Sequence, residues 1–428
     1  LTNMFHDTLV PCAERRNINM NKIKKYALSE LYDMSSGISS TKEQSGHGAP
    51  FVSFKTVFNN YFLPEELPDL MDTNEKEQET YSIKMGDVFI TRTSETIDEL
   101  AMSCVAVKNY PGATYSGFIK RLRPKTARIV YPKYMAFYFR SELFRKAVTN
   151  NAFMTLRASF NKDIFTFLDI YLPDYHEQVK IGDMLYSIEC KIQKNKKIND
   201  YLEEMANTIY DYWFVQFDFP DENGRPYKSS GGEMTFCKEL NQNIPQNWGY
   251  TSVGNITVCF DSDRIPLSNH QRQEMKGTIP YYGATGIMDY VNCAIFSGDF
   301  VLLAEDGSVM DDNGNPILQR ISGDVWINNH THVLQPVNGY SCRLLYLLLK
   351  DIPVSMIKTG SIQMKINQAN LNSYNILNIP DGIRSRFINQ IEPIDTKIIQ
   401  IQKENDNLKQ IRNWLLPMLM NGQATIED

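Results

Sequence analysis

Residues 181–213, IGDMLYSIECKIQKNKKINDYLEEMANTIYDYW, carry the pattern that decides the fold. Apolar residues, with an occasional Asn, recur there in alternating steps of four and three, the spacing of a helix that packs along one stripe. The same stepping returns in residues 387–419, FINQIEPIDTKIIQIQKENDNLKQIRNWLLPML. Each position of the second stripe equals a position of the first plus 206, as 387 − 181 and 419 − 213 show. The chain therefore contains one long helix twice, which indicates a tandem duplication.

The two helical stripes are expected to pack on each other. A single amphipathic helix of this length cannot bury its stripe alone, and a globule before each helix favours an antiparallel pair. Asn199 and Asn405 occupy equivalent positions, where a buried Asn would fix the register of the pair; the alternative is a solvated position. The predicted seam of this coiled coil consists of Ile181, Leu185, Ile188, Ile192, Asn199, Leu202, Ile391, Ile394, Ile398, Asn405 and Leu408.

The segments before the two helices also resemble each other. KMGDVFITRTSE (84–95) and FSGDFVLLAEDGS (296–308) both place a Gly-Asp turn before an alternating apolar strand. We therefore predict an α+β protein with two α/β globules, each followed by a long helix, and pseudo-two-fold symmetry. The predicted boundaries are an N-terminal tail over 1–22, globules over 23–175 and 241–382, helices over 176–215 and 383–422, and a connector over 216–240.

Composition narrows the classes of protein that fit. The chain has 428 residues, a net charge of −6 and seven Cys. The Cys count is odd and no CxxC pair occurs, which favours reduced thiols in a cytoplasmic protein over a disulfide framework or a zinc ribbon. No apolar run approaches the ~18 residues of a membrane span. We expect a cytoplasmic protein that makes no use of a membrane.

Four phrases of the sequence resemble those of one protein family. They are YDYWFVQFDFPDENGRPYKSSGGEM (210–234), NIPQNWGYTSVGNI (243–256), NNHTHVLQP (328–336) and TGSIQMKIN (359–367). Together with the doubled globule-plus-helix plan, they resemble the specificity (S) subunit of type I restriction-modification systems over nearly the full chain. The N-terminal half departs from the pattern, because it lacks a Pro-x-x-Trp opening and a Thr-Gly-Ser phrase.

The resemblance implies a DNA-reading subunit without catalysis of its own. In that family the globules are target-recognition domains, and each reads one half of a split site in double-stranded DNA. The paired helices are a spacer and dock two methyltransferase (M) subunits, and translocase/nuclease (R) subunits join the larger complex. No cofactor is then expected in this chain, and the partners would use S-adenosylmethionine, ATP and Mg²⁺.

The basic residues indicate where DNA would lie. Between Lys108 and Lys162 there are twelve Lys or Arg and one acid, Glu142, a distribution typical of phosphate neutralisation. In the second globule, KTGSIQMK (358–365) combines Lys for phosphates with Ser and Gln for base edges. In the first, LRASFNK (156–162) occupies the matching place. The predicted DNA-binding residues are Lys120, Arg121, Arg123, Lys125, Arg157, Ser159, Asn161, Lys162, Lys358, Gly360, Ser361, Gln363 and Lys365.

Other chemistry has weaker support. His330 and His332 lie on one face of a predicted strand, but no further ligand stands at suitable spacing, so no metal site is predicted. Asp263 with Glu274 and Lys276 faintly resembles a nuclease carboxylate set. No phosphate-binding GxxxxGK[ST] loop occurs. The alternatives left open are a specificity subunit of a type IIB-like system with a fused methyltransferase-nuclease, a self-contained nuclease, and a helical scaffold that binds no nucleic acid.

Overall fold

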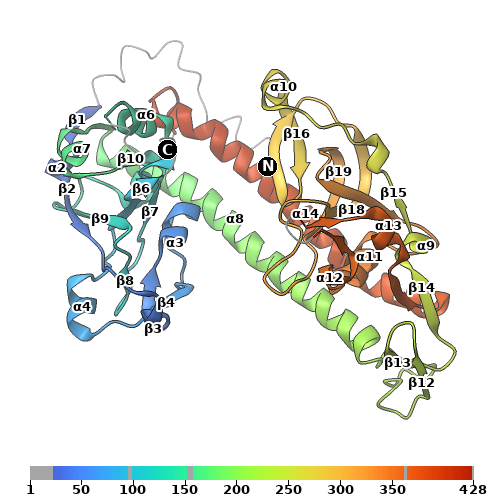
Figure 1. The fold of residues 1–428 in the computed structure, drawn as a ribbon. Helices are drawn as coiled ribbons and strands as arrows, with labels where there is room; N and C mark the ends of the chain where they lie inside the picture. The colour runs from blue at the N-terminus through green and yellow to red at the C-terminus, as the bar shows by residue number, and fades with distance from the viewer. Residues whose placement is uncertain (1–22, 95–98, 152–157, 361–363, 427–428) are drawn as a thin grey trace. The chain divides into compact units, whose positions relative to one another are not determined.

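The computed structural model describes residues 23–94, 99–151, 158–360 and 364–426. The predicted N-terminal tail, 1–22, lies outside them. The chain divides into two compact units, one of residues 1–194 with 405–428 and one of residues 195–404. Each unit contains one globule and a part of both long helices (Figure 1). We call them unit 1 and unit 2.

The globule of unit 1 is built on a four-stranded antiparallel sheet of strand order β2-β9-β5-β7. Its central strand β5, Val88–Thr91, is buried along its whole length, as expected for the VFIT run after the Gly-Asp turn. A three-stranded sheet of order β4-β3-β8 lies in the same globule. The remaining strands of the two sheets are β2 (Tyr32–Ser36), β9 (Ile119–Pro124), β7 (Ser103–Val105), β4 (Asp69–Met71), β3 (Ser45–Val52) and β8 (Thr114–Tyr115).

Short helices close the core of unit 1. Helix α5, Pro132–Tyr138, begins with Pro, whose missing N–H costs nothing at a helix start, and five of its residues are buried. Helix α6, Glu142–Asn151, buries Phe144 and Val148. The other helices here are α2 (Leu28–Leu31), η2 (Lys42–Gln44), α3 (Phe54–Asn59), α4 (Glu75–Thr80) and α7 (Lys162–Phe167).

The globule of unit 2 has a six-stranded mixed sheet of order β15-β20-β18-β19-β16-β17. Strand β18, Phe296–Ala304, lies between β20 and β19, and its last five residues are buried. The other strands are β15 (Thr257–Cys259), β16 (Lys276–Gly283), β17 (Gly286–Val291), β19 (Leu318–Ile327) and β20 (Thr331–Pro336). The helices are α9 (Val253–Ile256), η5 (Asp261–Asp263), α10 (Asn269–Glu274), α11 (Cys342–Leu349), α12 (Val354–Ile357) and α13 (Gln368–Ser373).

The duplication is visible in the strand pairing of the two globules. In unit 1, β1 (Lys24–Ala27) pairs antiparallel with β11 (Asp169–Leu172), and Lys24 lies opposite Leu172. In unit 2, β14 (Gly249–Ser252) pairs antiparallel with β23 (Asn375–Asn378), and Gly249 lies opposite Asn378. Residues 172 and 378 are 206 apart, the offset of the helical stripes. Each globule therefore closes in the same way immediately before its long helix.

The long helices are α8, Tyr175–Tyr210, which a π-helical turn η4 extends over Asp211–Val215, and α14, Asp381–Met420. In unit 1 the first part of α8 shares a buried core with the last part of α14, through residues such as Ile181, Leu185 and Leu415. In unit 2 the last part of α8 shares a core with the first part of α14. The helices therefore run antiparallel in contact. The predicted fold class of two mixed globules, each followed by a long helix, is confirmed.

Both seam Asn side chains reach across to the other helix. The Asn405 amide donates to the Ile192 carbonyl at 3.4 Å within unit 1, and the Asn199 amide donates to the Ile398 carbonyl at 3.4 Å within unit 2. The acceptors 192 and 398 are again 206 apart. Asn405 is buried and Asn199 half-buried, which favours the register role over the solvated alternative. Leu202, Ile394 and Leu408 are the half-buried apolar members of the seam, and its other apolar members are buried.

The predicted connector over 216–240 has structure of its own. Phe219 stacks on Tyr227 and on Trp248, with ring centroids 4.8 and 4.9 Å apart. Strand β12, Met234–Cys237, pairs antiparallel with β13, Gln242–Pro245. The turn-rich sequence therefore folds into a small aromatic-cored hairpin region. Among the helices that the structure describes, none is long and apolar enough to cross a membrane.

Candidate DNA interface

The predicted loop 358–365 of unit 2 forms a short hairpin. Strand β21, Lys358–Thr359, pairs antiparallel with β22, Lys365–Ile366, and Gly360 after β21 has a φ of 79°, which glycine adopts without strain. The Ile366 N–H donates to the Glu305 carbonyl at 2.8 Å, which attaches the hairpin to the end of β18. Two predicted DNA-binding residues, Ser361 and Gln363, lie outside the described residues.

A carboxylate beneath the hairpin is paired with two cations. Glu305 is 9% exposed and accepts from the Lys365 amine at 2.8 Å and from the Arg264 guanidinium at 2.6 Å. Burial alone would raise the pKa of Glu305, but its hydrogen bonds to Lys365 and Arg264 outweigh burial and lower the pKa. Glu305 is therefore a carboxylate at neutral pH and holds Lys365, a predicted phosphate contact, at the base of the hairpin.

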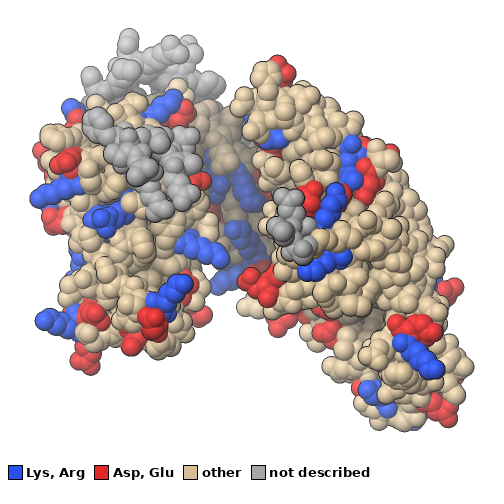
Figure 2. Space-filling model, viewed as in Figure 1, with Lys and Arg blue, Asp and Glu red and all other residues tan. Residues whose placement is uncertain are grey.

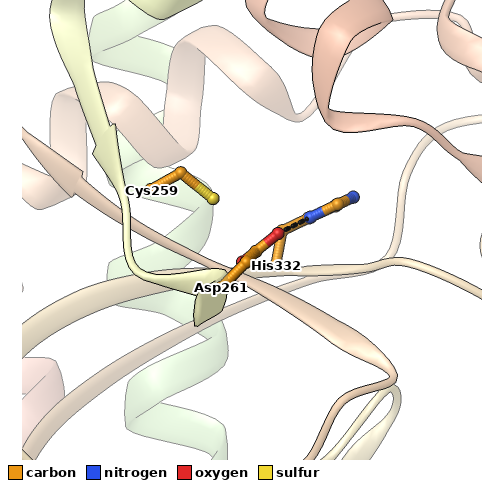
Figure 3. Close-up of side chains that lie close together, drawn as sticks. All are labelled: Cys259, Asp261 and His332. Carbon is orange, nitrogen blue, oxygen red and sulfur yellow. Dashed lines mark hydrogen bonds and ion pairs between the residues drawn. The ribbon is translucent and has the colours of Figure 1, made fainter. Parts of the chain in front are cut away.

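His332 connects the hairpin to η5, the turn that follows the edge strand β15. Its Nδ1 lies 2.5 Å from Asp261 Oδ2 (Figure 3), and its Nε2 lies 2.9 Å from the Ile366 carbonyl. Burial opposes the charged ring, but the hydrogen bond and charge of Asp261 prevail, so the pKa of His332 is raised. Since both ring nitrogens face acceptors, the protonated ring donates from each of them.

Three residues around the His332 ring have the spacing of metal ligands. Among the described residues, Cys259, Asp261 and His332 form the one group with metal-compatible spacing, their ligand atoms lying within 4.8 Å of one another (Figure 3). The Arg264 guanidinium, 3.5 Å from Asp261, would repel a dication there, and the Ile366 carbonyl and Asp261 already occupy the imidazole nitrogens. A hydrogen-bonded charge cluster accounts for this geometry.

The other weak candidates have separate partners. His330, considered with His332 as a metal pair, has its Nδ1 2.6 Å from Asp306, whereas His332 faces Asp261. Glu274 lies in an exposed pair with His270, their atoms 3.6 Å apart. The described residues therefore do not gather the carboxylates that were compared with a nuclease site.

Unit 1 builds the matching place on the same scaffold. Strand β10, Ala158–Ser159, pairs with β6, Thr93–Ser94, and the Phe160 N–H donates to the Arg92 carbonyl at 2.8 Å. Phe160 and Ile366 are 206 residues apart, and both anchor their segment to the end of a central strand. The expected correspondence of LRASFNK with the hairpin of unit 2 therefore has a geometric basis. Arg157 lies outside the described residues.

Asn161 has a structural task in that segment. Its side chain accepts from the Ile164 N–H at 2.9 Å and so caps helix α7. Lys162, the first residue of this helix, is exposed, and Ser159 is half-buried. Of the predicted contacts here, Lys162 is presented to solvent, while the side-chain Oδ1 of Asn161 is engaged by the cap.

Four of the predicted basic contacts of unit 1 lie on β9 or directly after it, and they fall into two environments. Arg121, 9% exposed, donates to the Ser82 carbonyl at 2.6 Å, and Arg123 makes a two-pronged contact with Asp87 at 2.7 and 2.6 Å. These two guanidiniums serve the globule itself. Lys120 instead reaches Ser36 at 2.6 Å, and Lys125 lies 3.4 Å from Asp33.

The twelve-to-one excess of basic residues therefore does not form one surface. The donors of the Arg140 guanidinium are used inside the globule, where they bind the backbone carbonyls of Ser103 and Val57 at 2.7 and 2.8 Å. Lys133 is paired with Asp183 at 2.7 Å. On the visible face of each unit, Lys and Arg are interspersed with Asp and Glu (Figure 2). Counting charges along the sequence overstated the basic area because it ignored these internal acceptors.

Comparison with known proteins gives the family. A family model described as the type I restriction modification DNA specificity domain matches residues 20–204 and 245–412. The chain belongs to this family. The two matched stretches fall on the two copies of the duplication, and the chain is a DNA specificity subunit of a type I restriction-modification system.

Similar proteins cover the whole chain. The MjaIX specificity subunit of Methanocaldococcus jannaschii is 26% identical over 96% of this chain and 94% of its own length. The HindI specificity subunit of Haemophilus influenzae is 21% identical over 94% of this chain and 100% of its own. A crystal structure of a type I S subunit from M. genitalium has the same fold, with a TM-score of 0.57 at 16% identity over 98% of this chain and 99% of that one.

Membership of the family decides two open alternatives. Specificity subunits are non-catalytic and carry no cofactor of their own, so the self-contained nuclease and the scaffold without nucleic acid are set aside. The expected resemblance to type I S subunits is confirmed.

Sequence reasoning missed two features of this specificity subunit. One is the charge cluster around His332, whose members come from separate strands. The other is a second apolar stripe on α8 and its extension η4, outside the seam, whose residues are between 37% and 67% exposed and recur in steps of three, four, seven and three: Ile198, Tyr201, Met205, Tyr212 and Val215. On α14, Trp414 is 60% exposed. The helical spacing of these residues was a signal that could have shown the stripe.

Proposed function

We propose that the two globules of this specificity subunit read the two halves of a split sequence in double-stranded DNA. The observation that carries this proposal is the repeated anchoring of a recognition segment: Phe160 to Arg92 in unit 1, and Ile366 to Glu305 in unit 2. The anchoring is the same, but the side chains that it presents differ. Two globules that share a scaffold but present different side chains are suited to a target whose two halves differ in sequence.

The recognition set proposed for each globule follows from exposure and placement. In unit 2 it consists of Lys358, Gly360 and Lys365 of the hairpin, and Ser361 and Gln363 stay in the set on the sequence alone because they lie outside the described residues. In unit 1, Lys120, Lys125, Ser159 and Lys162 are favoured over Arg121 and Arg123, because these two guanidiniums are held by internal acceptors. Arg157 stays in the set as a residue of the same segment. Lys and Arg would meet phosphates, and Gln and Ser would reach base edges.

The decisive experiment maps the modified bases of a genome. Cells that express this chain with its methylating partner are sequenced by a method that detects methyladenine on single molecules. A split motif with a fixed gap is expected. A continuous motif, or modification without sequence preference, would rule the proposal out.

We further propose that methyltransferase subunits dock on the helices, with translocase/nuclease subunits joining the complex. S-adenosylmethionine, ATP and Mg²⁺ would then be used by these partners, in the cytoplasm where DNA is accessible to them. Support comes from the stripe on α8 that begins at Ile198 and ends at Val215, and from Trp414 on α14, since exposed apolar stripes on long helices are typical of helix–helix interfaces.

Substitution of the stripe tests the docking proposal. Tyr201→Asp with Met205→Asp should abolish co-purification of the methyltransferase subunit, because two carboxylates would be desolvated in an apolar interface. Both side chains are exposed, so the thermal unfolding midpoint should change little. Lys196→Asp, an exposed position on the opposite side of α8, is the control and should leave co-purification intact. Equal loss with all variants would contradict docking on this stripe.

A further inference from the structure

The His332 ring is fixed by two acceptors that belong to different parts of unit 2. Asp261 belongs to η5, after the edge strand β15, and Ile366 is the last residue of β22 in the recognition hairpin. His332 is 2% exposed, and it lies on β20 opposite Leu303 of β18. The ring therefore links η5 to the hairpin, at the same end of the sheet where the hairpin is anchored.

Unit 1 has a lysine at the corresponding place. Lys120 lies on β9 opposite Ile90 of β5, and Ile90 is two residues before Arg92, which anchors the first recognition segment. His332 likewise lies opposite Leu303, two residues before Glu305, which anchors the second. The two cations thus occupy equivalent ladder positions.

The partners of these cations differ in kind. The Lys120 amine contacts the neutral Ser36 hydroxyl at 2.6 Å, whereas His332 contacts the carboxylate of Asp261. Arg92 of unit 1 is replaced in unit 2 by Glu305, which has the opposite charge. One scaffold therefore carries a lysine in one reader and a histidine–carboxylate bridge in the other.

We propose that His332 is a positioning residue whose protonated ring holds the recognition hairpin of unit 2, so that reading of one half-site depends on pH while reading of the other does not. This inference rests on the proposed function of the two globules. Histidine is the side chain whose charge ordinarily changes near neutral pH, whereas a lysine ordinarily titrates near about 10.4. Burial and the nearby Arg92 lower the pKa of Lys120 from that high starting value.

The sign of the effect follows from the hydrogen bonds. The pKa of His332 is raised by Asp261, so the bridge is complete below the ordinary value of about 6.5 and is lost as pH rises through the raised pKa. A neutral ring carries one N–H, so either the Asp261 carboxylate or the Ile366 carbonyl would then face a lone pair. The hairpin anchor weakens in the alkaline direction.

The other charged groups around the ring do not titrate in that range. Asp261 and Glu305 have lowered pKa values, because the hydrogen bonds to His332 and to Lys365 and Arg264 outweigh burial. Burial raises the pKa of Cys259 to about 12, so it stays a thiol. The pKa of Lys365 is raised by Glu305. His332 is therefore the group of this cluster whose charge ordinarily changes near neutral pH.

The test measures discrimination in each half-site separately. The complex of the chain with its methyltransferase partner is titrated between pH 6 and 9 with a duplex that carries the mapped split sequence, and with duplexes altered in one half at a time. The ratio of the dissociation constants for altered and intact DNA cancels effects of pH that are common to all duplexes. His332→Lys, which installs the cation of unit 1, and His332→Asn, which is uncharged, are compared with the wild type.

For the wild type, discrimination at the half read by unit 2 should fall up to about tenfold per pH unit above the pKa of His332, because only the protonated fraction is competent. Discrimination at the other half should stay constant. The His332→Lys variant should discriminate the half-site of unit 2 equally well at every pH. The His332→Asn variant should show weak discrimination at that half-site, and this discrimination should not change with pH.

Two results would overturn the inference: a parallel pH profile at both halves of the wild type, or an unchanged profile in His332→Lys. Sequence-specific binding of the wild type that does not change with pH would also refute the inference, but it would be compatible with the proposed reading of a split target. Absence of discrimination at every pH would instead refute the proposed function, and the inference with it. Circular dichroism of each variant shows that it is folded before titration.

Discussion

Arg343 joins the second globule to both long helices within unit 2. Its guanidinium is fully buried and donates to Glu203 of α8 at 2.7 and 3.1 Å and to Asp395 of α14 at 2.7 Å. Asp395 also accepts from Arg320 of β19 at 3.0 Å. Burial opposes the charge, but Glu203 and Asp395 raise the pKa of Arg343. A planar guanidinium can hold one carboxylate with two parallel hydrogen bonds while a further N–H reaches a second carboxylate, a geometry that a lysine ammonium does not offer.

Replacing Arg343 by Met should destabilise the protein by up to about 3–5 kcal/mol, because the buried Asp395 loses one of its two cations and Glu203 loses its partner. Urea denaturation followed by circular dichroism measures this loss. Arg225→Met is the matched control, since the Arg225–Asp221 pair is exposed at the arginine and should contribute less than about 1 kcal/mol. Similar losses for the two variants would show that the buried network is not the anchor inferred here.

At the scale of the helices, the two seam Asn residues lower the free energy of unfolding but fix the register of the helix pair. Asn405 is 6% exposed in a mainly apolar seam. Asn405→Leu should raise the free energy of unfolding by about 1 kcal/mol, because a buried polar seam residue is replaced by a well-packed apolar one. It should also reduce the fidelity of the mapped motif, since the hydrogen bond that fixes the register is lost. Urea denaturation and methylation mapping measure the two effects.

Asn407, two residues along α14, provides the control at this scale. Its side chain is exposed, so Asn407→Leu should change neither stability by more than about 0.5 kcal/mol nor the mapped motif. If Asn405→Leu instead destabilised the protein as strongly as a buried unsatisfied group would, the seam Asn would be a packing necessity and not a register device.

At the scale of the whole chain, the duplication makes the two readers exchangeable. Residues 23–174 end immediately before α8 and contain the antiparallel pair β1–β11 that closes the first globule. Replacing them with the corresponding globule of another family member should change one half of the methylated motif and leave the other half unaltered. Methyladenine mapping measures this outcome. A change in both halves would mean that the globules do not read independently.

The sequence by itself determined the duplication, the two long helices and the family. The 206-residue offset is a property of the amino-acid order, and helical periodicity is local. Both can therefore be recognised without knowledge of long-range contacts. The sequence also indicated that LRASFNK in the first copy corresponds to KTGSIQMK in the second, and the backbone hydrogen bonds of Phe160 and Ile366 agree with that correspondence.

The tertiary structure alone decided which charges serve the protein itself. Arg121 and Arg123 find Ser82 and Asp87 some forty residues earlier, as the sequence separations of 39 and 36 show. His332 meets Asp261 across 71 residues. Partners this distant are brought together by strand pairing, which no local pattern encodes, so a run of basic residues in the sequence could not be divided into internal anchors and solvent-facing contacts.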